Sequence, residues 1–314
     1  MARATLSVET EHPEGGRGSR PSGFRRVLAS LMLPKEHGAW AMLLMPYLMG
    51  SAAGWGGWAS FLLLVSILCL FVASRPLEVL LRNSHPRLLA RSQREGPIAA
   101  SSEEDSARER RRQAALRLVL YLGIGGSAGL LLALLYRLWA LPAMAIAAGV
   151  PLAAQLPLRR RGLDRTWPAR LLSIAALSAT GPAAYYAGTG SLDWHTLAVW
   201  LIAFLYSGAS VFYVRLVYQP PVRLKAASLE EGRHRARRQL LVYLGILALS
   251  LVLLIPLGWL PPLSSLAFVP LLLKVAWAWR KTDYHPTLKQ IGLAEIGHSS
   301  LFTLLAILAL VAWD

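Results

Sequence analysis

The residues of this 314-residue chain that could do chemistry are ionisable side chains within or beside long apolar runs. Lys35, Glu36 and His37 stand side by side where the first run begins. Glu295 and His298 lie three residues apart near the start of the last run. Buried carboxylates and imidazoles can accept and return protons. We therefore predict Glu36, His37, Glu295 and His298 as catalytic acid–base groups.

A second set of side chains has the chemistry to hold an anion. Arg75, Glu78 and Arg82 follow helical spacing, which places them on one helix face. Arginine binds carboxylate or phosphate through two parallel hydrogen bonds. The predicted ligand-binding residues are Lys35, Arg75, Glu78, Arg82, Tyr213 and Arg215. The alternative is that Arg75 and Glu78 only neutralise each other, and that Tyr213 and Arg215 are interface and boundary residues.

Glu295 lies about one helical turn inside an apolar run, where an unpaired carboxylate is costly. We predict Arg75 or Arg82 as its partner. Another span carries three more polar groups at helical spacing, Tyr206, Ser210 and Tyr213. All these groups lie in the halves of the spans that adjoin the basic connections. This placement predicts a polar cavity that opens on the basic side. No metal site is predicted, and the sequence leaves any cofactor unknown.

The elements that position these residues are membrane-spanning helices. Hydrophobic residues make up 55% of the chain and charged residues only 16%. Runs of about 18 or more apolar residues are typical of transmembrane helices. The sequence therefore predicts an all-α, polytopic helical bundle. Nine spans are expected, at residues 38–54, 58–81, 118–136, 138–157, 171–188, 195–214, 239–257, 263–279 and 291–312.

The basic residues indicate how the spans are oriented. Of the 33 Lys and Arg residues, 30 fall before the first span or in alternate connections. Such connections face the cytoplasm in multi-pass proteins. We expect a protein of the inner (plasma) membrane with its N-terminus in the cytoplasm and its C-terminus outside. The net charge of +16 is then a property of loops, so no nucleic-acid partner is expected and membrane lipids are.

Polar segments define the domain organisation. Residues 1–33 predict a disordered cytoplasmic tail, and residues 34–314 a single transmembrane domain. Mixed charge without apolar periodicity predicts a flexible cytoplasmic loop at about residues 83–113. Residues 111–124 and 237–246 both begin Arg-Arg-Gln and end Tyr-Leu-Gly-Ile. A repeat shifted by four helices would give two parallel four-helix halves plus a ninth helix.

The sequence PKEHGAW at residues 34–40 resembles the start of the YwiC-like family of bacterial membrane proteins. Further likeness lies in SRP at residues 74–76, Tyr213-Val-Arg215 and GLAEIGHS at residues 292–299. The resemblance implies a polytopic membrane protein and no particular activity.

More distantly, the expected topology resembles the UbiA superfamily of intramembrane prenyltransferases. That resemblance implies an isoprenoid diphosphate bound through Mg²⁺ at Asp-rich motifs on the second and sixth helices. The chain has five Asp residues, none of them at these positions. Glu78 is the carboxylate at the second-helix position, and Arg75 and Arg82 could replace the metal as partners of a phosphate.

Three functions remain open from the sequence. The first is a prenyltransferase-like enzyme that acts on an isoprenoid or lipid without the Asp-rich magnesium motifs. The second is a transporter or binding protein for a small anion or lipid headgroup. The third is haem or quinone handling with His37 and His298 as ligands, since histidine is a common haem ligand. A purely structural role, in which the polar groups fix helix packing, is the remaining alternative.

Overall fold

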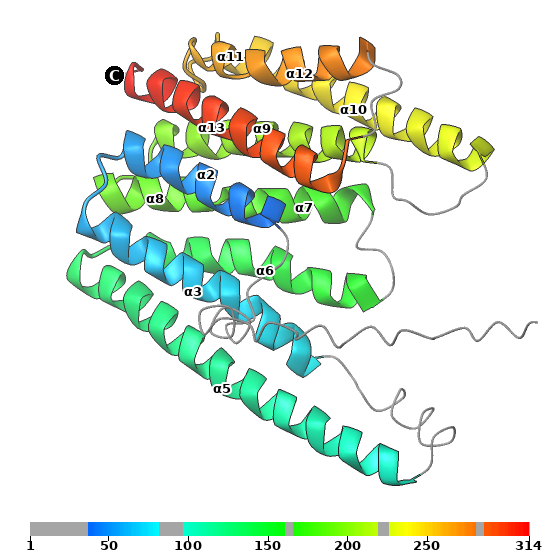
Figure 1. The fold of residues 1–314 in the computed structure, drawn as a ribbon. Coiled ribbons are helices and arrows are strands. Elements are labelled where there is room, and N and C mark those ends of the chain that lie inside the picture. The colour runs from blue at the N-terminus through cyan, green and yellow to red at the C-terminus, as the bar shows by residue number, and fades with distance from the viewer. Residues whose placement is uncertain (1–36, 82–96, 161–165, 219–225, 281–285, 314) are drawn as a thin grey trace, which may run out of the picture. The chain divides into compact units, whose positions relative to one another are not determined.

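The computed structural model describes residues 37–81, 97–160, 166–218, 226–280 and 286–313. Within these ranges the chain forms helices and no strand (Figure 1). Five helices contain a segment long and apolar enough to cross a membrane. They are α3 (Trp58–Leu81), α5 (Pro97–Leu135), α9 (Trp194–Val217), α10 (Ala226–Leu254) and α13 (Leu288–Val311). The predicted all-α membrane architecture is therefore confirmed in its helical and apolar character.

Shorter helices account for the other predicted spans. Two of these are α2 (His37–Ala53) and α6 (Ala140–Arg160), each with a shorter apolar segment. The remaining predicted spans fall on helix pairs: α7 (Trp167–Ser178) with α8 (Thr180–Thr189), and α11 (Ser264–Ala267) with α12 (Val269–Arg280). Nine crossings therefore stay a prediction, because five helices meet the length and hydropathy of a span.

Prolines explain why two of the predicted spans are broken. Pro182 has no N–H for the carbonyl of Ser178, and α7 ends at that serine. Pro270 likewise has no N–H for the carbonyl of Leu266, and the chain breaks at Phe268. The first break is bridged from α2, since Thr180 Oγ1 donates to the carbonyl oxygen of Leu43 at 2.8 Å.

Helix α5 differs from the expected flexible loop at residues 83–113. It is continuous from Pro97, so residues 97–113 are helical, while residues 82–96 lie outside the described ranges. The segment has no apolar stripe but has polar pairs at helical spacing. Gln113 Nε2 donates to Glu109 Oε1 at 2.9 Å, and Arg110 Nε donates to the Ser106 carbonyl at 3.1 Å. Such local pairs stabilise a solvated helix without a buried face.

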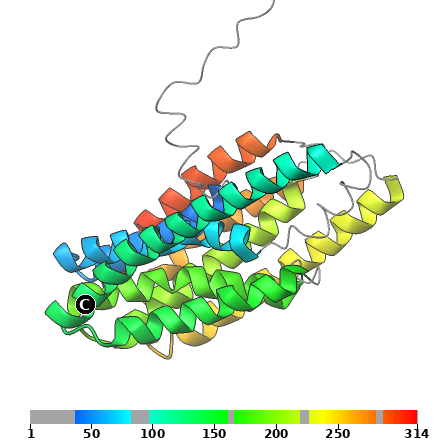
Figure 2. The same cartoon turned by 90° about the horizontal axis from the view of Figure 1, so that it is seen from below.

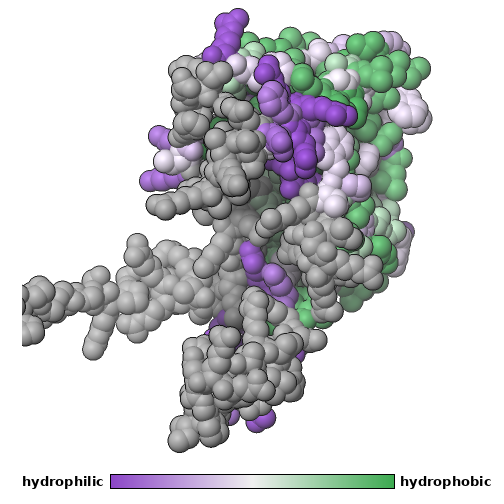
Figure 3. Space-filling model, turned by 90° about the vertical axis from the view of Figure 1, so that its right-hand side faces the viewer, coloured by the Kyte–Doolittle hydropathy of each residue, from purple (hydrophilic) through white to green (hydrophobic). Residues whose placement is uncertain are grey.

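The basic ends of the helices lie on one side. Figure 1 shows that α2, α5, α7, α10 and α13 begin on the right and that α3, α6, α9 and α12 end there. The turned view also places the beginnings of α5 and α10 on the same side (Figure 2). Figure 3 looks at this side and shows hydrophilic residues gathered beside a hydrophobic flank. The direction of the helices thus alternates as the predicted spans do.

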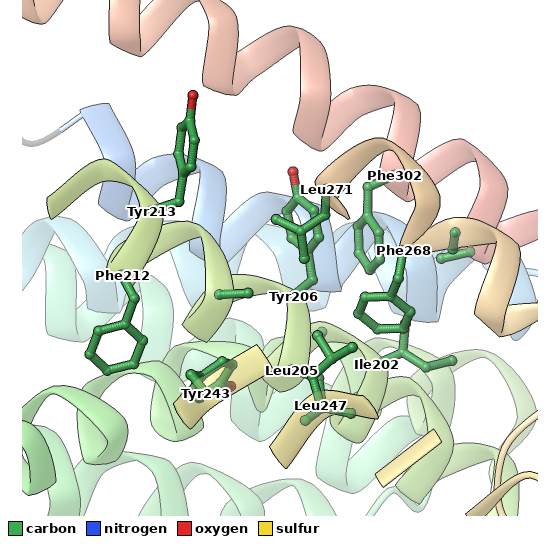
Figure 4. Close-up of a cluster of buried hydrophobic side chains, with 14 of the residues drawn as sticks. Ile202, Leu205, Tyr206, Phe212, Tyr213, Tyr243, Leu247, Phe268, Leu271 and Phe302 are labelled. Atoms are coloured by element: carbon green, nitrogen blue, oxygen red, sulfur yellow. The ribbon is translucent and has the colours of Figure 1, made fainter. Parts of the chain in front are cut away.

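Helix α9 lies at the centre of the larger hydrophobic core. In its apolar segment 61% of the residues are buried, against 17% in that of α10. Figure 4 shows side chains of α9 near Tyr243 and Leu247 of α10, Phe268 just before α12, Leu271 of α12 and Phe302 of α13. Outward apolar residues of α10, such as Val252 with 68% exposure, have no protein over them. These faces suit contact with lipid tails.

Glycines allow α2 and α8 to pack closely. A Cβ on Gly50 would lie 1.9 Å from the carbonyl oxygen of Gly181, and one on Gly188 would lie 2.1 Å from that of Gly54. Small residues at helix crossings let membrane helices approach and gain van der Waals contact. Helix α2 also packs on α13 and α9, so this crossing fixes one wall of the bundle around α9.

Candidate functional site

Three helices, α9, α12 and α13, pack together and each contributes one polar side chain to the same point. Ser210 lies on α9, Lys274 on α12 and Glu295 on α13. Arg215, Arg280 and Lys289 mark the basic ends of these helices. At 1.5 Å per residue, the three polar groups lie about 7 to 9 Å inside those ends. Their equal depth explains why they meet.

Lys274 and Glu295 form the central contact of this site. The ammonium Nζ donates to Glu295 Oε1 at 2.7 Å and to Oε2 at 2.9 Å. The side chain of Lys274 is 3% exposed and that of Glu295 is 19% exposed. Burying two charges costs more than most pairs recover, unless further hydrogen bonds satisfy them. Here the Ser210 hydroxyl supplies such a bond by donating to Glu295 Oε2.

Aromatic rings line the other side of the ammonium group. Lys274 Nζ lies 4.5 Å from the ring centroid of Tyr213 and 5.9 Å from that of Tyr206. A cation over an aromatic face is attracted by the ring quadrupole, most strongly where water is absent. Figure 4 shows both tyrosines projecting from α9 to the same side, opposite Phe212. The site is therefore an ion pair held in an aromatic and hydroxyl surround.

Tyr206 is the most constrained of these groups. Its ring stacks on Phe302 of α13 with centroids 3.7 Å apart, and the residue is 5% exposed. Its buried hydroxyl has no hydrogen-bond partner among the residues that the structure describes. A buried hydroxyl without a partner is costly and rare. The hydroxyl is therefore a hydrogen-bond donor that the described residues leave unused.

Of the two predicted partners of Glu295, Arg75 was wrong and Arg82 lies outside the described residues. Glu295 binds Lys274, whereas Arg75 Nη1 donates to Glu78 Oε2 on its own helix at 3.3 Å. The pair on α3 is half-exposed, with side-chain exposures of 31% and 43%. Helix α3 packs mainly on α5 and also on α8, so its charges belong to another face of the bundle. The alternative in which Arg75 and Glu78 neutralise each other is the one that these contacts favour.

The other predicted site residues are distributed as follows. Tyr213 lies beneath Lys274, whereas Arg215 is exposed and donates to Gln239 Oε1 of α10 at 2.7 Å. His298 Nδ1 lies 2.7 Å from the carbonyl oxygen of Ala294, so this nitrogen faces its own helix. His37 begins α2, which packs on α13, but its side chain is not described. Lys35, Glu36 and Arg82 lie outside the described residues.

Sequence reasoning missed Lys274 as a member of the site. A single lysine near the basic end of an apolar helix is usually read as one that reaches the headgroups. Its position six residues inside Arg280 was the available signal, because it matches the depth of Glu295 inside Lys289. No group of three or more metal-ligating side chains occurs in the part of the chain that the structure describes. The roles of His37 and His298 as haem ligands stay a prediction.

Comparison with known proteins gives one match. Residues 33–185 match the model of a family described as YwiC-like protein. No curated protein and no solved structure matches the chain. The first resemblance drawn from the sequence is therefore confirmed, and the more distant one to the UbiA superfamily stays a prediction. The matched region runs from α2 into α8 and ends at residue 185, whereas Ser210, Lys274 and Glu295 lie beyond it.

Proposed function

We propose that this multi-pass membrane protein, a member of the YwiC-like family by its residues 33–185, binds an oxyanion beside Lys274. The oxyanion is either a free small anion or the phosphate of a lipid headgroup. The observation that carries the proposal is the buried ion pair of Lys274 and Glu295. An incoming anion can replace the Glu295 carboxylate as the counter-ion of the Lys274 ammonium group. Ionisable residues within membrane helices are costly and mark ligand or ion pathways.

The surroundings of Lys274 supply what an oxyanion needs. An ammonium group has three N–H donors. The oxygen atoms of an incoming anion can accept the hydrogen bonds that Lys274 now donates to Glu295. The Tyr206 hydroxyl offers a further donor that the described residues leave unused. The tyrosine rings exclude water, which strengthens each electrostatic contact. Such a site favours an anion over a neutral or cationic ligand.

Entry from the cytoplasmic side follows from the charges at the helix ends. Arg215, Arg280 and Lys289 are exposed at the ends of the three helices that carry the site. Clustered basic residues raise the local concentration of anions and attract acidic headgroups. The proposal includes nine crossings of the plasma membrane, an N-terminus in the cytoplasm and a C-terminus outside. Reporter fusions after residues 54, 136 and 190 should report the outer side, and fusions after 160 and 280 the cytoplasm.

A flux experiment tests the anion site. The full-length protein in proteoliposomes should carry radiolabelled sulfate, and Lys274→Met should abolish the flux. Arg110→Met, on the solvated part of α5, is the matched control and should leave flux unchanged. Binding of short-chain phosphatidylglycerol without sulfate flux would assign the site to a lipid headgroup. If Lys274→Met binds and carries both probes like the wild type, the site is not at Lys274.

A second candidate is an enzyme that acts on a membrane-dissolved lipid or isoprenoid. The hydrogen bond from Ser210 to Glu295 favours it, because a carboxylate so placed can accept a proton during a transfer reaction. Incubation with prenyl diphosphates and acceptors, with and without Mg²⁺, should then give a product that Glu295→Gln fails to form. Binding without any product across the acceptor panel would leave the anion site as the better account.

A further inference from the structure

The contacts of Glu295 point to a role for its carboxylate in proton uptake, and this inference rests on the proposed oxyanion site. We propose that the protein takes up one proton, on the carboxylate of Glu295, for each oxyanion that binds Lys274. The protein is then a proton-coupled anion binder, and any flux through it is symport of an anion with a proton. The step adds a proton to the carboxylate and breaks no covalent bond of the anion.

Charge balance at the site requires this coupling. In the structure the single positive charge of Lys274 is matched by Glu295. A singly charged oxyanion that replaces Glu295 at the ammonium group leaves two negative charges beside one positive charge, about 8 Å inside the helix ends. An unmatched charge in such a place is costly. A proton on Glu295 restores neutrality, so anion and proton bind together.

The geometry makes Glu295 the group that can receive the proton. Its side chain is 19% exposed, whereas that of Lys274 is 3% exposed, so the carboxylate is the more accessible partner of the pair. The Ser210 hydroxyl now donates to the carboxylate. A hydroxyl can equally accept, so Ser210 can receive a hydrogen bond from the protonated acid after it leaves Lys274. The carboxyl group thus has a partner in both states.

No other Asp or Glu lies within the described helices that pack on α13. Glu295 is the one Asp or Glu within α2, α9, α12 and α13. On α9 the titratable groups beside the ion pair are Tyr206 and Tyr213, whose phenols are ordinarily neutral near pH 7. On α2, Tyr47 donates to the carbonyl oxygen of Ser60, and the side chain of His37 is not described. On α13 itself, His298 turns Nδ1 to the Ala294 carbonyl. The neighbouring helix α11 carries two serines and no ionisable group.

The test counts protons and anions together. Full-length protein in a non-ionic detergent and weak buffer receives nitrate or short-chain phosphatidylglycerol, two monoanions that do not titrate near neutral pH. A pH-indicator dye reports proton uptake, and labelled probe reports binding. The wild type should take up one proton per bound anion. Over the pH range in which one proton is coupled, its affinity for the anion should fall about tenfold for each unit by which the pH rises. Agreement between the two probes would show that the charge, not the source of the anion, sets the coupling.

Variants separate this inference from the site itself. Glu295→Gln should bind the anion without proton uptake and with an affinity that does not change with pH. The carboxylate control Glu109→Gln, on the solvated part of α5, should behave as the wild type. Binding by the wild type without proton uptake overturns the coupling and leaves the site standing. Binding of neither probe by the wild type overturns both, and the wild-type count decides the matter if Glu295→Gln fails to fold.

Discussion

The ammonium nitrogen of Lys274 lies 4.5 Å from the ring centroid of Tyr213, so this ring and the carboxylate of Glu295 hold the same cation. The ring can be tested without touching the ion pair. Tyr213→Phe keeps the aromatic face and should lower the free energy of unfolding less than Tyr213→Leu does. Tyr213→Leu removes the face and should cost about 1–2 kcal/mol.

The measurement is unfolding of the purified protein in mixed micelles by titration with SDS. Equal losses for the two variants would assign the contribution of Tyr213 to packing or to its hydroxyl rather than to its ring.

Breaking the ion pair from one side should cost more than removing it whole. Lys274→Met or Glu295→Leu each leaves one buried charge without its partner, which costs about 3–5 kcal/mol in buried pairs. The double variant leaves apolar side chains and should recover most of that loss. A double-mutant cycle in the same unfolding assay gives the coupling energy. Additive losses would mean that the two side chains do not interact in the membrane.

The crossing of α2 and α8 should not tolerate a methyl group. Gly50→Ala would place a Cβ 1.9 Å from the Gly181 carbonyl oxygen, so the helices must move apart. Overpacking of this kind costs about 1–3 kcal/mol. Gly149→Ala on α6 is the matched control, because a Cβ there meets nothing within 4 Å. The midpoint of thermal unfolding should fall for the first variant only, and a stable Gly50→Ala protein would contradict the close crossing.

Acid should weaken the cap of α9 at Asp193. Burial acts to raise the pKa of this carboxyl, but hydrogen bonds from Thr196, Ser191 and Tyr185 and the charge of His195 outweigh it, so the pKa lies below its ordinary value. A group with a lowered folded pKa adds stability above its unfolded pKa, about 4, and that stability is lost as the pH falls through the folded pKa.

The matched variant for this cap is Asp193→Asn, because asparagine also caps helices well but does not titrate. Between about pH 4 and pH 2 the midpoint of thermal unfolding should fall more steeply for the wild type than for this variant. Parallel curves would show that Asp193 does not titrate with folding.

The position of a single helix could be predicted from the sequence, whereas the helices that pack against it could not. The apolar run from Trp58 to Leu81 predicts a helix with the same ends that α3 has, because length and hydropathy alone decide such a helix. The breaks after Ser178 and at Phe268 depend on prolines that membrane helices often absorb, as α2 absorbs Pro46. Their effect depends on what neighbouring helices supply to the freed backbone groups.

The candidate site shows the same division. The depth of Glu295 and the shared face of Tyr206, Ser210 and Tyr213 follow from helical spacing, and the structure brings Ser210 and both tyrosines to the ion pair. The partner could not be predicted, because spacing does not tell which helices pack on α13. Lys274 is the partner of Glu295 because α12 packs on α13, and no pattern in the sequence of α12 indicates this contact.

The ion pair also constrains how the protein is made. Lys274 leaves the ribosome 21 residues before Glu295, so α12 reaches the translocon before its counter-charge does. A helix carrying a bare ammonium group partitions poorly into lipid, and a helix carrying a bare carboxylate does no better. The last two hydrophobic segments therefore gain most by leaving the translocon together as a hairpin, with α9 already waiting to receive them.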